Sequence, residues 1–148
     1  MSYSANEILT NLWLGDIRDS RNHEFINSMD IIINCTKKLP FINENKKCIR
    51  VSIDDNLQKE EIANLYKYLE PITKFMHMKL TDNKKIFVHC YAGKQRSVSI
   101  ICGYLMKYLN LSYNQSTELI RSKRHHIFTP LSNFEAALKI WEDTISKK

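Results

Sequence analysis

A strand-to-helix connection in the second half of this 148-residue chain sets the architecture that the sequence can adopt. Residues 85–89, KIFVH, form an apolar run that is typical of a short buried strand. Residues 97–109 then repeat apolar side chains at spacings of three and four, which predicts a helix facing the core. Only a short loop separates the two elements. A buried strand that leads directly into an amphipathic helix indicates an α/β arrangement.

Further strand-like runs, rich in Ile and Val, occur earlier in the chain at 8–14, 30–34 and 48–53. Each is short enough for a buried strand. The strands come early and alternate with helices, and helical patterns accumulate toward the C-terminus. This order predicts one α/β domain over residues 1–148, with a sheet covered by helices.

The helical patterns have recognisable starts and one interruption. A stripe of apolar residues covers 57–80, and Pro71 within it is expected to kink or split that helix. The sequence SYNQ at 112–115 reads as a capping box that opens the next helix. Thr129 followed by Pro130 predicts the N-terminus of the last helix, as an N-cap and a proline in the first turn.

The charge balance favours anionic partners. Lysine and arginine number 22 against 16 acidic residues, and the formal net charge of +6 attracts phosphorylated molecules at long range. The basic residues are dispersed, so nucleic-acid binding is not expected. One local basic cluster, a candidate for substrate selection or for ordinary solvated surface, comprises Arg121, Lys123, Arg124, His125 and His126.

No stretch approaches the roughly 20 consecutive apolar residues of a membrane-spanning helix. The sequence begins MSYSANEI, without the pattern of a secretory signal and without the glycine after Met1 that myristoylation requires. We therefore expect a cytoplasmic protein with no stable membrane association. The sequence carries no heptad repeat, and it leaves monomer and homodimer equally open.

The four cysteines are Cys35, Cys48, Cys90 and Cys102, and no two of them form a C-x-x-C pair. A domain of this size does not need disulfides, and no cysteine or histidine stands at zinc-ligand spacing. We expect neither a disulfide framework nor a metal site. Three of the cysteines are expected to be inert apolar side chains, and Cys90 differs because of its neighbours.

The loop between Cys90 and Arg96 has the composition of an anion-binding site. Five residues closed by the start of a helix can turn successive backbone N–H groups toward one point, where the helix dipole adds positive potential. Gly93 permits the tight backbone, and Arg96 can give two parallel hydrogen bonds to a phosphate. The same field favours the thiolate of Cys90, a nucleophile to which Ser97 can donate a hydrogen bond.

Residues 89–97, HCYAGKQRS, resemble the H-C-x-x-G-x-x-R-S signature of the cysteine-based protein tyrosine phosphatase superfamily, and their surroundings resemble the dual-specificity phosphatases. The resemblance extends through segments 12–15, 33–36, 103–106 and 130–134. It implies a single-domain protein tyrosine phosphatase-like fold with a central, mostly parallel sheet covered by helices. It also implies hydrolysis of phosphotyrosine and phosphoserine or phosphothreonine in protein substrates through a cysteinyl-phosphate intermediate, without metal or cofactor.

The resemblance assigns roles to the residues of the motif. Cys90 is the nucleophile, Ser97 assists departure of its thiolate, and His89 supports the loop. Arg96 and the backbone of the loop hold the phosphate oxygens. The phosphate-binding residues are thus Tyr91, Ala92, Gly93, Lys94, Gln95 and Arg96.

The general acid of such enzymes lies on a loop after a strand that ends in an isoleucine-proline-valine-like run. The sequence RVSIDDN at 50–56 is similar to that region. The similarity gives the role of general acid to Asp55, and Asp54 is the alternative.

Two positions depart from the family pattern. Gln95 stands where a serine is common, and we expect this change to alter the rim of the loop more than the chemistry. Leu131 stands where an asparagine often braces the loop, and Asn133 is a candidate to replace that asparagine. The chain also lacks the segment that deepens the pocket of phosphotyrosine-specific members, which favours dual specificity.

Two alternative functions remain open at this point. The Ala-Gly-Lys run ending at Lys94 is similar to the loop of phosphoinositide phosphatases, although Tyr91 replaces a second lysine found there. A module that binds phosphoproteins with little turnover would use Arg96 and the basic residues, but it would have no need of a thiolate. Separately, Cys35 or Cys102 is a candidate to form a disulfide with an oxidised Cys90.

Overall fold

The computed structural model describes residues 3–147 and contains one five-stranded sheet. The strand order is β1-β2-β5-β3-β4. β1 pairs antiparallel with β2, and every other neighbouring pair is parallel. The sheet is thus mostly parallel, as predicted. The strands are β1 (Asn6–Leu9), β2 (Leu12–Gly15), β3 (Ile31–Asn34), β4 (Lys47–Arg50) and β5 (Ile86–His89).

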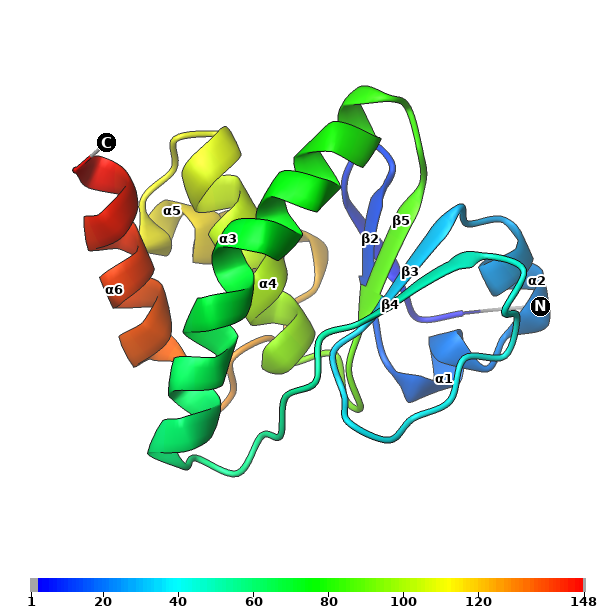
Figure 1. The fold of residues 1–148 in the computed structure, drawn as a ribbon, viewed down its shortest axis with the longest axis horizontal. Helices are drawn as coiled ribbons and strands as arrows, with labels where there is room; N and C mark the ends of the chain where they lie inside the picture. Colours follow the sequence, from blue (N-terminus) through cyan, green and yellow to red (C-terminus); the bar gives the residue numbers. More distant parts are fainter. Residues whose placement is uncertain (1–2, 148) are drawn as a thin grey trace.

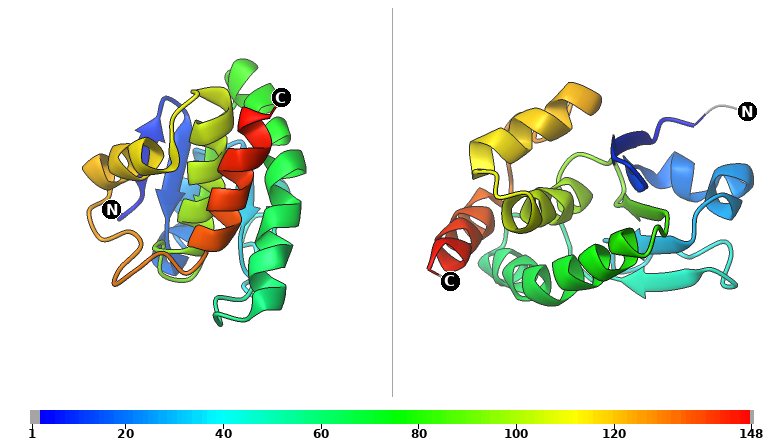
Figure 2. Two further views of the ribbon diagram at one scale, coloured as in Figure 1. Left: turned by 90° about the vertical axis from the view of Figure 1, so that its left-hand side faces the viewer. Right: turned by 90° about the horizontal axis from the view of Figure 1, so that it is seen from above.

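Helices cover both faces of this sheet (Figures 1 and 2). The four longer helices lie on one face, and two short helices that the sequence patterns did not predict lie on the other. Among residues 3–147, no helix combines the length and the apolar character needed to cross a membrane. The helices are α1 (Ile17–Ser20), α2 (His23–Asn27), α3 (Lys59–Thr81), α4 (Arg96–Tyr108), α5 (Tyr113–Lys123) and α6 (Glu135–Ser146).

The neighbouring strands β5 and β3 lie in the interior of the sheet. Both are apolar at every position before their last residue, because both faces of the sheet are buried there. Ile31 and Ile33 of β3 point into the main core, together with Ile86 and Val88 of β5. The alternate residues of both strands enter a smaller core on the other face. That smaller core is built around Phe25, Ile26, Ile32 and Phe87.

Residues 8–14, predicted as one strand, form parts of two antiparallel strands instead. The chain reverses at Asn11, whose φ of 69° lies in the left-handed region that asparagine tolerates. The backbone N–H of Asn11 donates to the Glu7 carboxylate at 2.9 Å and stabilises the turn. Only Thr10 and Asn11 interrupt the apolar residues between positions 8 and 14, which is why the sequence was interpreted as one strand.

Two helices differ in part from what the sequence predicted. A kink or a split was expected at Pro71, and the helix is not split, because α3 is continuous from Lys59 to Thr81. Leu69, Ile72 and Met76 are buried on its inner face, and this burial offsets the roughly 3 kcal/mol that an interior proline costs. The last helix begins at Glu135 and not at Pro130, because other contacts hold residues 131–133 across the start of α4. The capping box of α5 is present, as predicted.

Candidate active site

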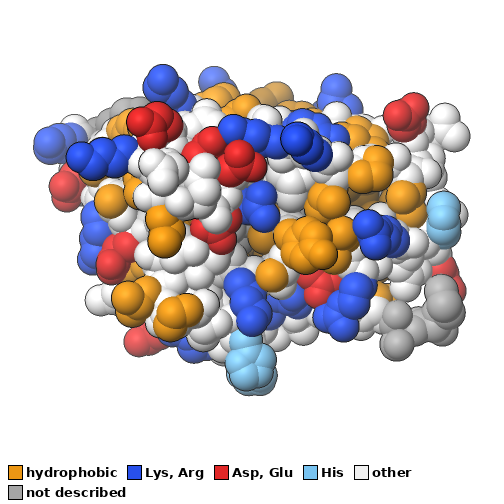
Figure 3. Space-filling model, turned by 90° about the horizontal axis from the view of Figure 1, so that it is seen from below, with side chains coloured by type: hydrophobic (Ala, Val, Ile, Leu, Met, Phe, Trp, Pro, Cys, Tyr) orange, Lys and Arg blue, Asp and Glu red, His pale blue; other side chains and the backbone are white. Residues whose placement is uncertain are grey.

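The loop of residues 90–95 lies at the carboxyl end of β5, beside the ends of the parallel strands β2 and β3. It leads directly into α4, a 13-residue helix whose first residue is Arg96. Figure 3 views the molecule from this end, and lysine and arginine side chains surround the middle of the face. The sequence placed the loop at a helix N-terminus, and the structure confirms that position.

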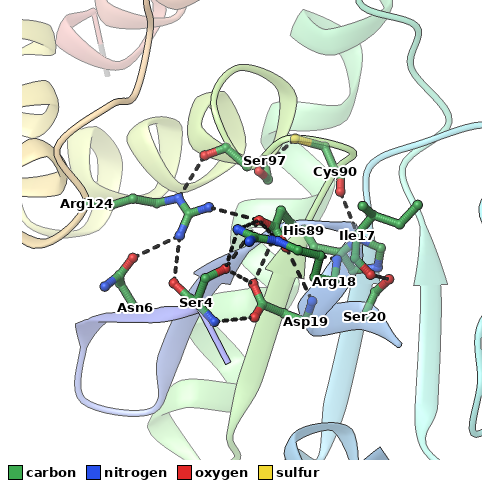
Figure 4. Close-up of polar contacts among 12 residues, drawn as sticks. Ser4, Asn6, Ile17, Arg18, Asp19, Ser20, His89, Cys90, Ser97 and Arg124 are labelled. Carbon is green, nitrogen blue, oxygen red and sulfur yellow. Dashed lines mark hydrogen bonds and ion pairs between the residues drawn. The ribbon is translucent and has the colours of Figure 1, made fainter. Parts of the chain in front are cut away.

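Cys90 and Ser97 lie together at this helix start (Figure 4). The Cys90 Sγ is 3.0 Å from the Ser97 Oγ, and both residues are buried. A hydroxyl at this distance can donate a hydrogen bond to a thiolate. The pair can therefore support both attack by sulfur and its later departure.

Arg96 connects the loop to the segment that follows β4. Its Nη1 donates to the backbone carbonyl oxygen of Ile53 at 3.0 Å. Its buried Nε has no hydrogen-bond partner among residues 3–147. Since a guanidinium carries five N–H donors, Arg96 retains donors for an anion after making this structural bond.

The loop's carbonyl groups are bound by the surrounding protein. The Tyr91 carbonyl accepts from the Ile17 N–H, the Gly93 carbonyl from Arg124 Nε, and the Lys94 carbonyl from the Phe128 N–H, each at 2.9 Å. In a trans peptide the N–H points away from the carbonyl of the same unit. The backbone N–H groups of residues 92, 94 and 95 therefore point away from these partners, which is the arrangement of an anion-binding nest.

Gly93 is needed at its position for two reasons. Its φ of +67° is a backbone conformation that side-chain-bearing residues rarely adopt. A Cβ at Gly93 would also lie 2.5 Å from the Arg124 guanidinium and 2.7 Å from the Gly15 carbonyl oxygen. The loop can close in this shape only with glycine here.

His89 is buried beneath the loop. Its Nδ1 is 3.2 Å from the Cys90 carbonyl oxygen, and its ring stacks on Phe87 at 5.2 Å between centroids. Burial lowers the pKa of His89 to about 4, so the ring is neutral at neutral pH. A neutral ring packed under the loop fits the supporting role predicted for this residue.

This buried histidine predicts a loss of stability in acid. The unfolded chain takes up a proton at His89 near pH 6.5, whereas the folded protein resists doing so until about pH 4. The free energy of unfolding should therefore fall by about 3 kcal/mol from this group as the pH drops from 7 to 4. Urea unfolding across this range, in wild type and in His89→Asn, measures the contribution. Equal pH dependence in the two proteins would contradict it.

The two neighbouring aspartates have different surroundings. Asp54 forms an ion pair with Lys37, with 3.4 Å between its Oδ2 and Nζ, and its N–H contacts the Glu61 carboxylate. Asp55 is exposed, and its Oδ1 accepts a hydrogen bond from Asn133 Nδ2 at 2.8 Å. The contact between Arg96 and Ile53 holds this segment against the loop. Among the described residues, Asp55 thus contacts Asn133 and has no cation within ion-pair distance, whereas Asp54 is paired with Lys37.

Residues 12–144 match the family described as dual specificity phosphatase, catalytic domain. The chain belongs to the dual specificity phosphatase family.

Three similar proteins illustrate the relationship. Dual specificity protein phosphatase 9 of Homo sapiens is 34% identical over 144 residues, which cover 94% of this chain and 36% of that protein. Dual specificity protein phosphatase 1B of Arabidopsis thaliana is 26% identical, with 95% of this chain and 83% of that protein covered. The crystal structure of human DUSP28 has the same fold, with a TM-score of 0.86 and 20% identity over 99% of this chain and 97% of that one. This chain spans about a third of the length of the first curated relatives it matches.

In this dual specificity phosphatase domain, Gln95 takes over the contact that an asparagine was expected to make. Its buried amide donates to the Leu131 carbonyl at 2.8 Å and accepts from the Asn133 N–H at 2.9 Å. The brace therefore runs from a side chain of the loop of residues 90–95, the predicted phosphate loop, to the backbone of residues 131–133. Asn133 contributes to it through its main chain, and its side chain is left to contact Asp55.

Arg124, assigned by sequence to a surface cluster, is a structural residue of the loop. Besides the Gly93 carbonyl, its guanidinium contacts the Ser4 carbonyl and the Asn6 side chain at 2.9 Å each (Figure 4). Its Nη2 lies 3.8 Å from the Asp16 carboxylate. No local sequence pattern distinguishes Arg124 from the neighbouring cations, because all of these partners are distant in sequence. Gly93 is 31 positions away, and Ser4 and Asn6 are more than 100 positions away.

Other basic residues of the cluster remain at the surface of the domain. Lys123, His125 and His126 line a cavity of about 300 Å³, together with Lys94 and Ala92 of the loop. Asp16 and Arg18 form part of the same wall. The cavity lies next to the loop of residues 90–95, because Ala92 and Lys94 belong to its lining.

The two cysteines considered as partners of Cys90 differ in position. Cys35 follows β3, and its N–H donates to the His89 carbonyl at 2.8 Å, so it lies beside Cys90 on the neighbouring strand. Burial, and then the charge of Cys90, hold the pKa of Cys35 well above its usual range. Cys102 lies within α4, where its Sγ contacts the Met106 sulfur and where burial raises its pKa to about 12. Cys35 is thus the better placed of the two for a disulfide with Cys90.

Proposed function

We propose that this domain hydrolyses phosphomonoesters on tyrosine and on serine or threonine of protein substrates, through a cysteinyl-phosphate intermediate. The observation that carries the proposal is the contact between Cys90 and Ser97 inside a loop whose carbonyls are bound outward. A nucleophilic sulfur placed within a ring of N–H donors matches the needs of phosphoryl transfer. Membership in the dual specificity phosphatase family supports the same reaction.

In the first step, the Cys90 thiolate attacks phosphorus as the bond between phosphorus and the ester oxygen breaks. Asp55, in its protonated form, donates its proton to the departing oxygen and leaves a neutral alcohol or phenol. Arg96 and the loop N–H groups hold the three equatorial oxygens, where negative charge is concentrated in the transition state. His89 supports the loop from below.

In the second step, a water molecule attacks the phosphorus of the cysteinyl-phosphate. The Asp55 carboxylate takes the proton from that water, and the sulfur–phosphorus bond breaks to release inorganic phosphate. Ser97 donates a hydrogen bond to the departing thiolate, which lowers the barrier to its departure. The enzyme returns to its starting state with Asp55 protonated.

A phosphoinositide substrate is the second candidate, and one observation favours it. Lys94 lines the basic cavity beside the loop, where a ring carrying further phosphates would meet Lys123 and the neighbouring histidines. A binding module with little turnover is the weaker alternative, because a binder does not need a nucleophile next to a hydroxyl donor. The free cysteines of the described residues support a reducing compartment, which we propose is the cytoplasm.

The experiment that tests the function measures phosphate release from matched phosphotyrosine and phosphothreonine peptides and from a soluble phosphoinositide, in reducing buffer without metal. We expect turnover of both peptides. Turnover of the phosphoinositide alone would replace protein with lipid as the substrate class. The absence of turnover on all three, with phosphopeptide binding retained, would support the binding module.

A further inference from the structure

A chain of hydrogen bonds links the phosphate loop to Asp55. Gln95, the last loop residue, is only 7% exposed although its side chain is polar. Both ends of its amide are bonded to residues 131–133, at 2.8 Å to the Leu131 carbonyl and 2.9 Å from the Asn133 N–H. These two contacts fix the position of Asn133 relative to the loop.

Asn133 in turn contacts Asp55. Its Nδ2 donates to the Asp55 Oδ1 at 2.8 Å, across 78 positions of sequence. Asp55 belongs to an exposed segment without regular secondary structure between β4 and α3. Among the described residues, two hydrogen bonds connect this segment to the phosphate loop. One joins Ile53 to Arg96, and the other joins Asp55 to Asn133, which Gln95 binds.

The direction of this hydrogen bond has a chemical consequence. The Asn133 Nδ2 can only donate, and the carbonyl oxygen of a carboxylic acid is a better acceptor than its hydroxyl oxygen. When Asp55 is protonated, the contact at Oδ1 therefore favours the proton on Oδ2. The contact therefore selects which oxygen carries the proton and restricts rotation of the carboxyl group, and both effects prepare the group for transfer to a leaving oxygen.

We propose that Asn133 and Gln95 are positioning residues for the general acid, in which Gln95 holds Asn133 and Asn133 orients Asp55. The inference rests on the role proposed above for Asp55. It gives a function to Gln95, which stands where a serine is common in the family. A serine has a shorter side chain and one hydroxyl, and it cannot form both hydrogen bonds that the Gln95 amide makes to residues 131–133. The acid is then coupled to the loop that binds the phosphate, and both move as one unit.

The test uses two substrates that differ in their need for an acid. Phenyl phosphate releases a strongly basic phenoxide that requires a proton, whereas p-nitrophenyl phosphate releases a stable nitrophenolate that does not. The measured quantity is the ratio of kcat/KM for phenyl phosphate to kcat/KM for p-nitrophenyl phosphate, because kcat/KM excludes hydrolysis of the cysteinyl-phosphate that both substrates form. Damage to the loop or to the fold lowers both kcat/KM values and leaves the ratio unchanged, so the ratio reports on proton donation to the leaving group.

We expect Asp55→Asn to lower this ratio about 100-fold, the lower range for loss of a general acid. Asn133→Ala should lower it about tenfold, and Asn133→Asp, which keeps the shape but removes the donor, at least as much. Gln95→Met, which keeps the length of the side chain but loses both hydrogen bonds, should also lower the ratio. Adding Asn133→Ala to Asp55→Asn should lower the ratio no further, because the group that Asn133 orients is already absent.

Asn43→Ala is the matched control, since Asn43 Nδ2 also donates to an exposed side chain, that of Asn27 at 2.7 Å, on another part of the surface. Its ratio should equal that of wild type. If Asp55→Asn lowers the ratio and Asn133→Ala does not, the positioning role is wrong while the acid remains. If Asp55→Asn itself leaves the ratio unchanged, the assignment of the acid fails, and the inference fails with it. An additive loss in the double variant would overturn the inference as well.

Discussion

Replacing Cys90 with serine should reduce phosphate release from every substrate by at least about 10⁴-fold, the order of loss seen when an enzyme is deprived of its nucleophile. A serine hydroxyl is far less acidic than a thiol, and among residues 3–147 the hydrogen-bond partner at this position is the Ser97 hydroxyl, which is not a general base. Arg96 and the loop N–H groups are unchanged in this variant. Binding of a phosphorylated ligand should therefore persist when turnover is lost.

The measurement pairs steady-state phosphate release with the affinity of Cys90→Ser for a phosphotyrosine peptide. Cys48→Ser is the matched control, because Cys48 is a free, partly exposed cysteine on β4. It should retain full activity. Turnover by Cys90→Ser within tenfold of wild type would show that another group attacks phosphorus. Loss of binding together with turnover would mean that the serine had disturbed the loop.

Replacing Arg96 with lysine should reduce kcat/KM by about 10²- to 10³-fold although the positive charge is kept. A lysine ammonium is a compact charge that cannot form two parallel hydrogen bonds to phosphate. It also cannot contact a phosphate and the Ile53 carbonyl with separate arms of one planar group, as the guanidinium can. The variant should therefore lose the paired hydrogen bonds to the phosphate and the hydrogen bond to the segment that carries Asp55.

Competitive inhibition by inorganic phosphate measures the loss of phosphate binding separately from the loss of the contact with the segment that carries Asp55. We expect the inhibition constant for phosphate to rise in Arg96→Lys, and kcat to fall in addition. Arg21→Lys, at an exposed arginine after α1, is the control that keeps the same chemical change away from the loop. If Arg96→Lys retained wild-type kcat/KM, phosphate would be held by charge alone and the bidentate role would be wrong.

Much of the fold could be predicted because its signals are local. The apolar run of β5, the loop with its glycine and the periodic start of α4 are contiguous, so the sequence alone placed Cys90, Arg96 and Ser97 at one helix N-terminus. Errors arose where distant contacts decided the outcome. The turn at Asn11 interrupts a pattern that looks continuous, and burial of its inner face keeps α3 intact through Pro71.

The choice between Asp54 and Asp55 shows most clearly which features of the site the sequence alone could not predict. The two residues are adjacent and chemically identical, and only the tertiary structure pairs one with Lys37 and the other with Asn133. The same holds for Gln95 and Arg124, whose partners lie 31 to 120 positions away. Residue order determines strands, helices and the groups within one loop, because neighbours along the chain share one local geometry. Contacts between distant segments depend on how those elements pack, and packing decided which aspartate contacts Asn133 and which arginine binds the Gly93 carbonyl.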